Sequence, residues 1–251
     1  MSEFFPDAIF GSVAADSWFG FDRIIFVRIV LTVVVLGLLW LGVRKATLVP
    51  GRGQSVVEMG LDFIRVQIAE QVMGKERAKP YIPLLATIFI TVLAMNIGGV
   101  IPGLNIAGSA RLGVPLVLAV WLLLVYLSAG VRKQGFVGYV KSQLFPAGVP
   151  KVMYILLTPI ELLQVLIIRP ATLVIRLVAN MMAGHIMMVL AIGATHFLIL
   201  EGAGLLKLAG VATFAGGLFI TGFEIFVAAL QAYIFALLSA IYLNFALEEE
   251  H

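Results

Sequence analysis

Cysteine is absent from this 251-residue chain, and charged residues make up only 12% of it. Without cysteine there can be no disulfide and no thiolate metal site. The sequence also has no phosphate-binding glycine loop, no cluster of metal ligands at recognisable spacing and no nucleophile paired with a base. The 17 basic and 14 acidic residues form no compact basic patch with interleaved aromatics, which argues against a nucleic-acid partner. We therefore expect no enzyme active site, no cofactor and no metal.

Hydrophobic residues are abundant, at 61% of the chain, with a mean hydropathy of +1.08. Soluble domains contain only about 45–50% apolar residues and about 25% charged ones. The composition thus predicts an all-α integral membrane protein. The acidic start Met1-Ser-Glu3 lacks the basic residues of a signal peptide, so the first apolar segment is expected to be an uncleaved anchor.

We expect one polytopic membrane domain over 1–251, with about five to six membrane helices and one amphipathic surface helix. Residues 1–23 form an external N-terminal segment, and 24–43 form a first span of about 20 residues, enough to cross about 30 Å of hydrocarbon. Residues 82–130 are expected to form a helical hairpin with spans at 82–101 and 114–130. A loop is expected at 131–151.

The segment 53–79 differs from the spans because charged residues alternate with apolar ones along it. Its apolar residues recur at steps of three and four, as in an amphipathic helix: Val56, Val57, Gly60, Leu61, Ile64, Ile68 and Val72. Such a helix is suited to lying on the membrane or against another subunit.

Two apolar tracts, 153–200 and 205–247, are each about twice the length of a span. They predict either two crossings each or long tilted helices, with Pro159 and Pro170 as kinks in the first tract. The turn Glu201-Gly-Ala-Gly204 would join them into a long helical hairpin over 153–247.

The orientation follows from the basic loops. Residues 44–79 and 131–151 hold most of the lysines and arginines, and the positive-inside rule makes that side cytoplasmic. A multi-pass protein of the cell inner or plasma membrane is expected, with its N-terminus outside and its C-terminus in the cytoplasm.

Polar residues are concentrated between 161 and 188. An ionisable group at membrane depth costs between ~2.5 and ~17 kcal/mol, yet this stretch contains Glu161, Arg169, Arg176, Asn180 and His185. Arg176 lies far from either end of its apolar tract, and its guanidinium does not lose its proton. It therefore needs a partner. The alternative to a functional role is an ion pair with Glu161 or Glu224 that only fixes helix packing.

An acid and a base, Glu224 and His185, are placed on the two long tracts. If they face each other they can form a hydrated proton relay, since both titrate when desolvated. The alternative is an ordinary interhelical hydrogen bond. Gln231, seven residues after Glu224, would orient Arg176 or water. For Arg169, which precedes Pro170, structural and functional roles both remain open.

The run Arg176-Leu-Val-Ala-Asn180-Met-Met-Ala-Gly184-His185 resembles the a subunit of bacterial F-type ATP synthases. Two further stretches resemble the same family: Pro50-Gly51-x-x-Gln54-x-x-x-Glu58, and Leu230-Gln231-Ala-Tyr-Ile-Phe235 through Tyr242-Leu243. The resemblance reaches from about residue 50 to the C-terminus.

This resemblance implies a non-catalytic stator channel in the lipid bilayer, beside a rotating ring of c subunits. Its other partners would be b/delta-type peripheral stalk subunits. Protons would use two aqueous half-channels separated by Arg176, which would face a carboxylate of the c-ring. Asn180 and Gln231 would lie beside Arg176, and His185, Glu224, Glu161 and Arg169 would line the proton pathway. Nucleotide chemistry would belong to other subunits, and protons are favoured over sodium ions.

The sequence departs from the family pattern at four places, one of which is the region around Arg111, where a channel carboxylate is missing. His185 and Glu224 occupy positions where many relatives have glutamate and histidine, so the pair is exchanged here. The spacing from Glu161 to Arg169 is one residue longer than usual. Asn96 is followed by Ile-Gly-Gly rather than by an acid.

A rival function is a secondary transporter that binds an anionic substrate at Arg176. It predicts internal repeats and broken helices, and the sequence shows neither. A purely structural assembly subunit would not need His185, Glu224 and Gln231 together.

Overall fold

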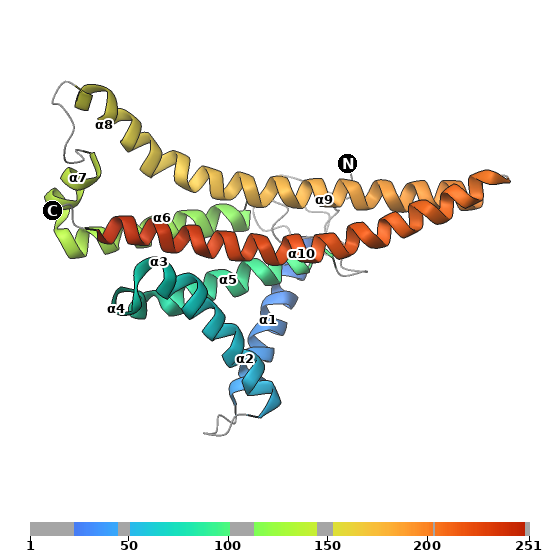
Figure 1. Cartoon of the computed structure of the whole chain (residues 1–251), viewed down its shortest axis with the longest axis horizontal. Coiled ribbons are helices and arrows are strands. Elements are labelled where there is room, and N and C mark those ends of the chain that lie inside the picture. The colour runs from blue at the N-terminus through green and yellow to red at the C-terminus, as the bar shows by residue number, and fades with distance from the viewer. Residues whose placement is uncertain (1–22, 45–50, 101–112, 145–152, 203, 249–251) are drawn as a thin grey trace, which may run out of the picture. The chain divides into compact units, whose positions relative to one another are not determined.

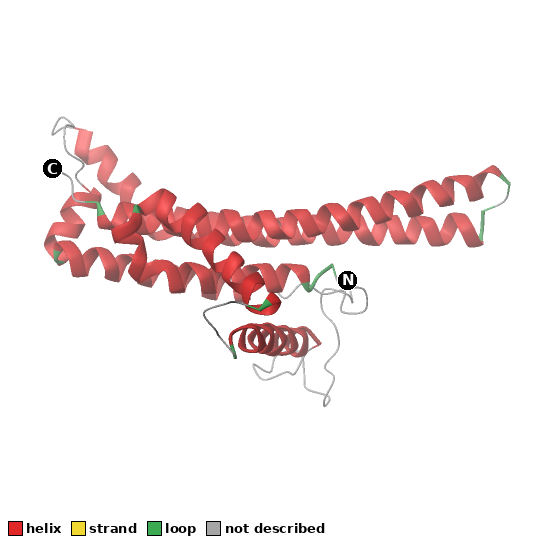
Figure 2. Ribbon diagram, turned by 60° about the horizontal axis from the view of Figure 1, so that its bottom comes forward, coloured by secondary structure: helices red, strands yellow, loops and turns green. Residues whose placement is uncertain are grey.

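The computed structural model describes residues 23–44, 51–100, 113–144, 153–202 and 204–248. Regular structure in these ranges is entirely helical, and no strand occurs among them (Figures 1 and 2). The expectation of an all-α membrane protein is confirmed. The expected external segment, 1–23, lies outside the described residues except for Arg23.

Four helices in the described ranges are long and apolar enough to cross a membrane: Lys75–Ile97, Gly113–Gln134, Tyr154–Leu200 and Leu206–Leu247. A shorter apolar helix, Phe26–Gly42, lies within α1 (Arg23–Val43). The third helix has 47 residues, about 70 Å at 1.5 Å per residue. Because hydrocarbon is only about 30 Å thick, the two double-length tracts are long helices that must tilt or extend beyond it.

The segment expected to be one amphipathic helix, 53–79, is interrupted. It contains α2 (Arg52–Phe63), a π-helix η1 (Ile64–Glu70) and a short α3 (Gln71–Met73). Gly74 then adopts a φ of 76°. The helix breaks there because helical residues have a negative φ, and glycine is the residue that takes a positive φ readily. From there α4 (Lys75–Ala78) and η2 (Lys79–Tyr81) lead into α5 (Ile82–Ile97).

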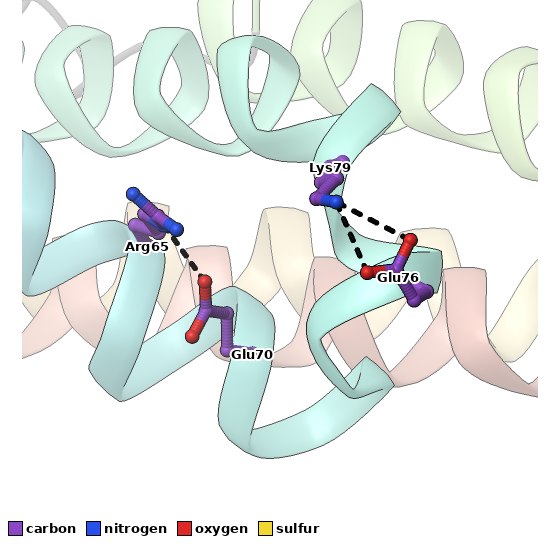
Figure 3. Close-up of polar contacts among 4 residues, drawn as sticks. All are labelled: Arg65, Glu70, Glu76 and Lys79. Carbon is purple, nitrogen blue, oxygen red and sulfur yellow. Dashed lines mark hydrogen bonds and ion pairs between the residues drawn. The ribbon is translucent and has the colours of Figure 1, made fainter.

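Exposed ion pairs join neighbouring turns of this segment (Figure 3). The Nε atom of Arg65 lies 2.7 Å from a carboxylate oxygen of Glu70, and the Nζ atom of Lys79 lies 3.0 Å from Glu76. Exposed pairs of this kind contribute little to stability because water screens them. One pair precedes Gly74 and the other follows it, so the two flank the break in the helix.

The residues group into two compact units. The first unit is built from 1–54, 91–110 and 178–231, and the second from 55–90, 111–177 and 232–251. Both long helices, α9 (Arg169–Leu200) and α10 (Leu205–Leu247), contribute to each unit.

In the first unit, α9 and α10 pack antiparallel through small residues (Figure 1). Gly217 lies against Ala191, and the Thr195 and Thr213 hydroxyls are 3.1 Å apart in a hydrogen bond. The contacts recur every seven residues, with Gly210, Gly217 and Glu224 facing Leu198, Ala191 and Gly184, respectively. Seven-residue repeats and small interface residues are typical of closely packed membrane helices.

In the second unit, α6 (Gly113–Gln134) and α7 (Phe136–Leu144) hold the end of α10. The last carbonyls of a helix have no partner within it. Here the Lys133 ammonium donates to the Leu247 carbonyl at 2.6 Å, and the Gln134 amide donates to that of Glu248 at 2.7 Å. The expectation of a loop at 131–151 is wrong for the described residues 131–144, which are helical except at Gly135.

The close packing in the first unit predicts a difference between two glycines of α10. A Cβ at Gly210 would lie 2.7 Å from Ile199 Cγ1 and 3.2 Å from Leu198 Cβ, whereas one at Gly216 would meet nothing within 4 Å. Overpacking costs about 1–3 kcal/mol, and alanine in place of glycine gains about 1 kcal/mol of helix propensity. Gly210→Ala should therefore have a lower free energy of unfolding than Gly216→Ala in detergent titrations followed by circular dichroism. Equal stability of the two variants would contradict this packing.

Candidate functional site

Arg176 lies within the first half of α9, in a long apolar helix, and its side chain is exposed. The preceding residue, Ile175, is also exposed, at 64%, so an apolar side chain neighbours the arginine on this part of the helix surface. No described residue forms an ion pair or a hydrogen bond with the Arg176 guanidinium. The alternative in which an internal ion pair only fixes packing therefore finds no support in the described part of the chain.

A cavity of about 230 Å³ lies within the first unit, between α9, α10 and the residues that follow α5. Asn180, His185 and Glu224 all line it, together with Gly99 and Val100. Water occupies about 30 Å³ per molecule in the liquid, so the cavity has room for several. The base and the acid singled out from the sequence thus border the same space, where water can connect them.

The Glu224 carboxyl group lies directly against Gly184. A Cβ built on Gly184 would collide with that carboxyl group, so a side chain at 184 would make the end of Glu224 move aside. His185 is the next residue along α9, and both it and Glu224 are half-buried. Gly184 was not singled out from the sequence. The signal that could have identified it is a small residue seven positions before Ala191, on the packed face of α9.

Gln231 belongs to the same unit and is buried. It follows Glu224 by seven residues on α10, which places both on one side of the helix. Its amide can donate and accept hydrogen bonds but carries no charge. Asn180 lies four residues after Arg176 on α9, one helical turn away.

Glu161 and Arg169 belong to the second unit. Arg169 is half-buried, and its guanidinium carbon lies over the rings of Tyr242 and Phe245, 5.5 and 5.8 Å from their centroids. These cation–π contacts tie the start of α9 to the last turns of α10. Glu161, on α8 (Tyr154–Leu163), is also half-buried and forms no ion pair with a described residue.

A second, larger cavity of about 480 Å³ lies farther along the same helix pair in the first unit. Its lining is mainly apolar, with His196 and the hydroxyls of Thr195 and Thr221 as polar groups. Among the residues that the structure describes, no three metal-ligating side chains gather at one place.

Comparisons with known proteins agree on one family. The family model described as ATP synthase A chain matches residues 25–244. The chain is 41% identical to the ATP synthase subunit a of Rhodococcus erythropolis over 252 residues, covering 100% of the chain and 90% of the relative. It is 39% identical to that of Frankia alni over 212 residues (83% and 71% covered), and 41% identical to that of Hyphomonas neptunium over 219 residues (87% and 83% covered).

Proposed function

The chain belongs to the ATP synthase A chain family, a membrane-sector subunit, and we propose that it is the proton-translocating stator of an F-type ATP synthase. It provides two aqueous half-channels separated by Arg176 and couples proton flow to rotation of a c-ring. It catalyses no nucleotide chemistry itself. Its partners are the c-ring, the b/delta-type peripheral stalk subunits and the lipid bilayer.

The observation that carries this proposal is the exposed guanidinium of Arg176 without a partner among the described residues. A permanent charge on an apolar helix face is costly in hydrocarbon. A partner from outside the chain relieves this cost, and a deprotonated carboxylate on a neighbouring subunit has the required charge. A carboxylate that moves past on a rotating ring meets the arginine once in each step.

Arginine suits the boundary between two half-channels because it cannot pass a proton on. Its guanidinium stays charged under all working conditions. It attracts the ionised form of the ring carboxylate and thereby favours release of the proton on one side. One charge that crosses 100 mV gains about 2.3 kcal/mol, and several protons in series supply the work of rotation.

The cavity between α9 and α10 supports a role in one half-channel. It places Glu224 and His185 around a space that can hold water, with Asn180 toward Arg176 along α9. A carboxyl group and an imidazole can both take up and release protons near neutral pH when their surroundings shift their pKa values toward it. We assign them to proton transfer between solvent and the ring carboxylate, with Gln231 orienting water or Arg176.

The transporter alternative loses support from the long helices. Transporters of that kind bind substrate at broken helices, whereas α9 and α10 run uninterrupted for 32 and 43 residues. We place the N-terminus outside and the C-terminus in the cytoplasm. Arg169, which stacks on the last turns of α10, then lies with Glu161 toward the cytoplasmic half-channel.

The first prediction concerns Arg176. Lysine is a poor substitute because its ammonium is compact, lacks the planar fork and can lose its proton when buried. We expect Arg176→Lys to abolish ATP-driven proton pumping in membrane vesicles, and Arg176→Ala to abolish it while permitting passive proton leak. Assembly of each variant complex is checked first. Normal coupled pumping by either assembled variant would refute the proposed function.

A second prediction tests the acid–base pair. His185→Ala and Glu224→Ala should each reduce proton flux, because each leaves an unpaired group at the cavity. The double exchange, His185→Glu with Glu224→His, retains an acid and a base. Its proton flux should be higher than the sum of the losses in His185→Glu alone and Glu224→His alone would give. Fluxes are compared in a double-mutant cycle; simple additivity would exclude the relay.

A third prediction tests the orientation. The chain has no cysteine of its own, so a single introduced cysteine reports its side without background. Ser2→Cys should react with a membrane-impermeant maleimide from outside, and Lys141→Cys, which is exposed on α7, should react only in inverted vesicles. The reverse pattern would show that the chain is inserted the other way.

A further inference from the structure

The helix that leads to Arg169 changes its hydrogen-bond pattern just before that residue. Residues Gln164–Ile168 form a π-helix, η4, and the N–H of Arg169 donates to the Gln164 carbonyl five residues earlier. A π-turn holds one residue more than an α-turn. This local change determines how residues on either side of it are oriented around the helix axis.

Glu161 and Arg169 are eight residues apart. In a regular α-helix of 3.6 residues per turn, eight residues correspond to two turns and about 80° more. The π-helix between them takes up one residue, so that the two side chains return to nearly the same side of the helix. The longer spacing in the sequence is thus absorbed before Arg169.

The π-helix leaves one main-chain acceptor without a helical donor. In an α-helix the Val165 carbonyl would accept from the N–H of Arg169, but that N–H is donated to Gln164. In a continuing π-pattern the donor would be residue 170, which is proline and has no N–H. Val165 is 5% exposed, and in a membrane no bulk water can replace the missing donor.

The missing donor comes from another helix. The Tyr126 hydroxyl, on α6, donates to the Val165 carbonyl at 2.6 Å. Tyr126 is 1% exposed, and its ring centroid lies 6.3 Å from that of Tyr242. Tyr126 therefore contacts both the π-helix that precedes Arg169 and the ring on which the Arg169 guanidinium stacks.

We propose that Tyr126 is a positioning residue, whose hydroxyl locks the π-helix and thereby sets the place of Arg169 in the cytoplasmic proton path. This rests on the proposed function, in which Arg169 and Glu161 line that path. Tyr126 itself transfers no proton. It acts through the Val165 carbonyl, which requires a side-chain donor because residue 170 is proline.

The test removes only the hydroxyl. Tyr126→Phe keeps the packed ring, and the rate of ATP-driven proton pumping per assembled complex should fall by about threefold to tenfold, as for loss of a buried hydrogen bond. Tyr139→Phe is the matched control. The Tyr139 side chain is 5% exposed in the same unit, and its hydroxyl has no hydrogen-bond partner among the described residues. Its loss should leave pumping within about 1.5-fold of the wild type.

A second variant tests the mechanism. Pro170→Ala restores an N–H that can donate to Val165, so Tyr126→Phe with Pro170→Ala should pump within about twofold of Pro170→Ala alone. General loosening of the core would not be repaired this way. If Tyr126→Phe prevents assembly, the amount of assembled complex is measured instead of pumping. Its recovery on adding Pro170→Ala would support the proposal in the same way. Pumping by Tyr126→Phe equal to that of Tyr139→Phe, or failure of Pro170→Ala to rescue, would overturn the proposal.

The Arg176 variants separate this inference from the proposed function. Normal pumping by those variants refutes the channel assignment whatever Tyr126 does. If they fail to pump while Tyr126→Phe behaves as the wild type, the positioning role alone is refuted.

Discussion

Hydrocarbon supplies no hydrogen bonds, and each polar group that a chain carries into the membrane must find its partner within protein or trapped water. In this chain the hydroxyls of Thr195 and Ser239 donate to carbonyls one turn earlier in their own helices. Tyr126 supplies a donor across helices to a carbonyl that the helix cannot satisfy. Arg176 is a charged group for which no described residue provides a partner. Its guanidinium is therefore available for the pairing with a neighbouring subunit that we propose.

Small residues govern where space remains between the two long helices. Glycine and alanine at seven-residue steps, with the Thr195–Thr213 hydrogen bond, let α9 and α10 approach closely over one stretch. Where the series reaches Gly184, the Glu224 side chain packs against the glycine, and a cavity opens beside them. The cavity is mainly apolar, and the polar groups that line it include Asn180, His185 and Glu224.

The sequence alone was sufficient for the membrane class, the two long helices and the polar residues, because hydropathy and buried charge act over whole segments. It was insufficient where geometry depends on a single backbone angle or on contacts distant in the sequence. The break at Gly74 depends on one residue's φ within a continuing amphipathic pattern. The basic segment after Gly130 was read as a loop, yet it is largely helical, and its Lys133 and Gln134 side chains cap the end of α10, more than a hundred residues later. His185 and Glu224 were identified by type, but their shared cavity depends on the register of two helices.

Gly184 couples two positions on different helices. A side chain at 184 would occupy the place of a Glu224 carboxyl oxygen, which stands at the end of a flexible side chain and can move aside. The backbones of α9 and α10 need not separate for this to happen. A substitution at 184 would therefore change where the acid lies, and with it the lining of the cavity, before it changed how the two helices pack.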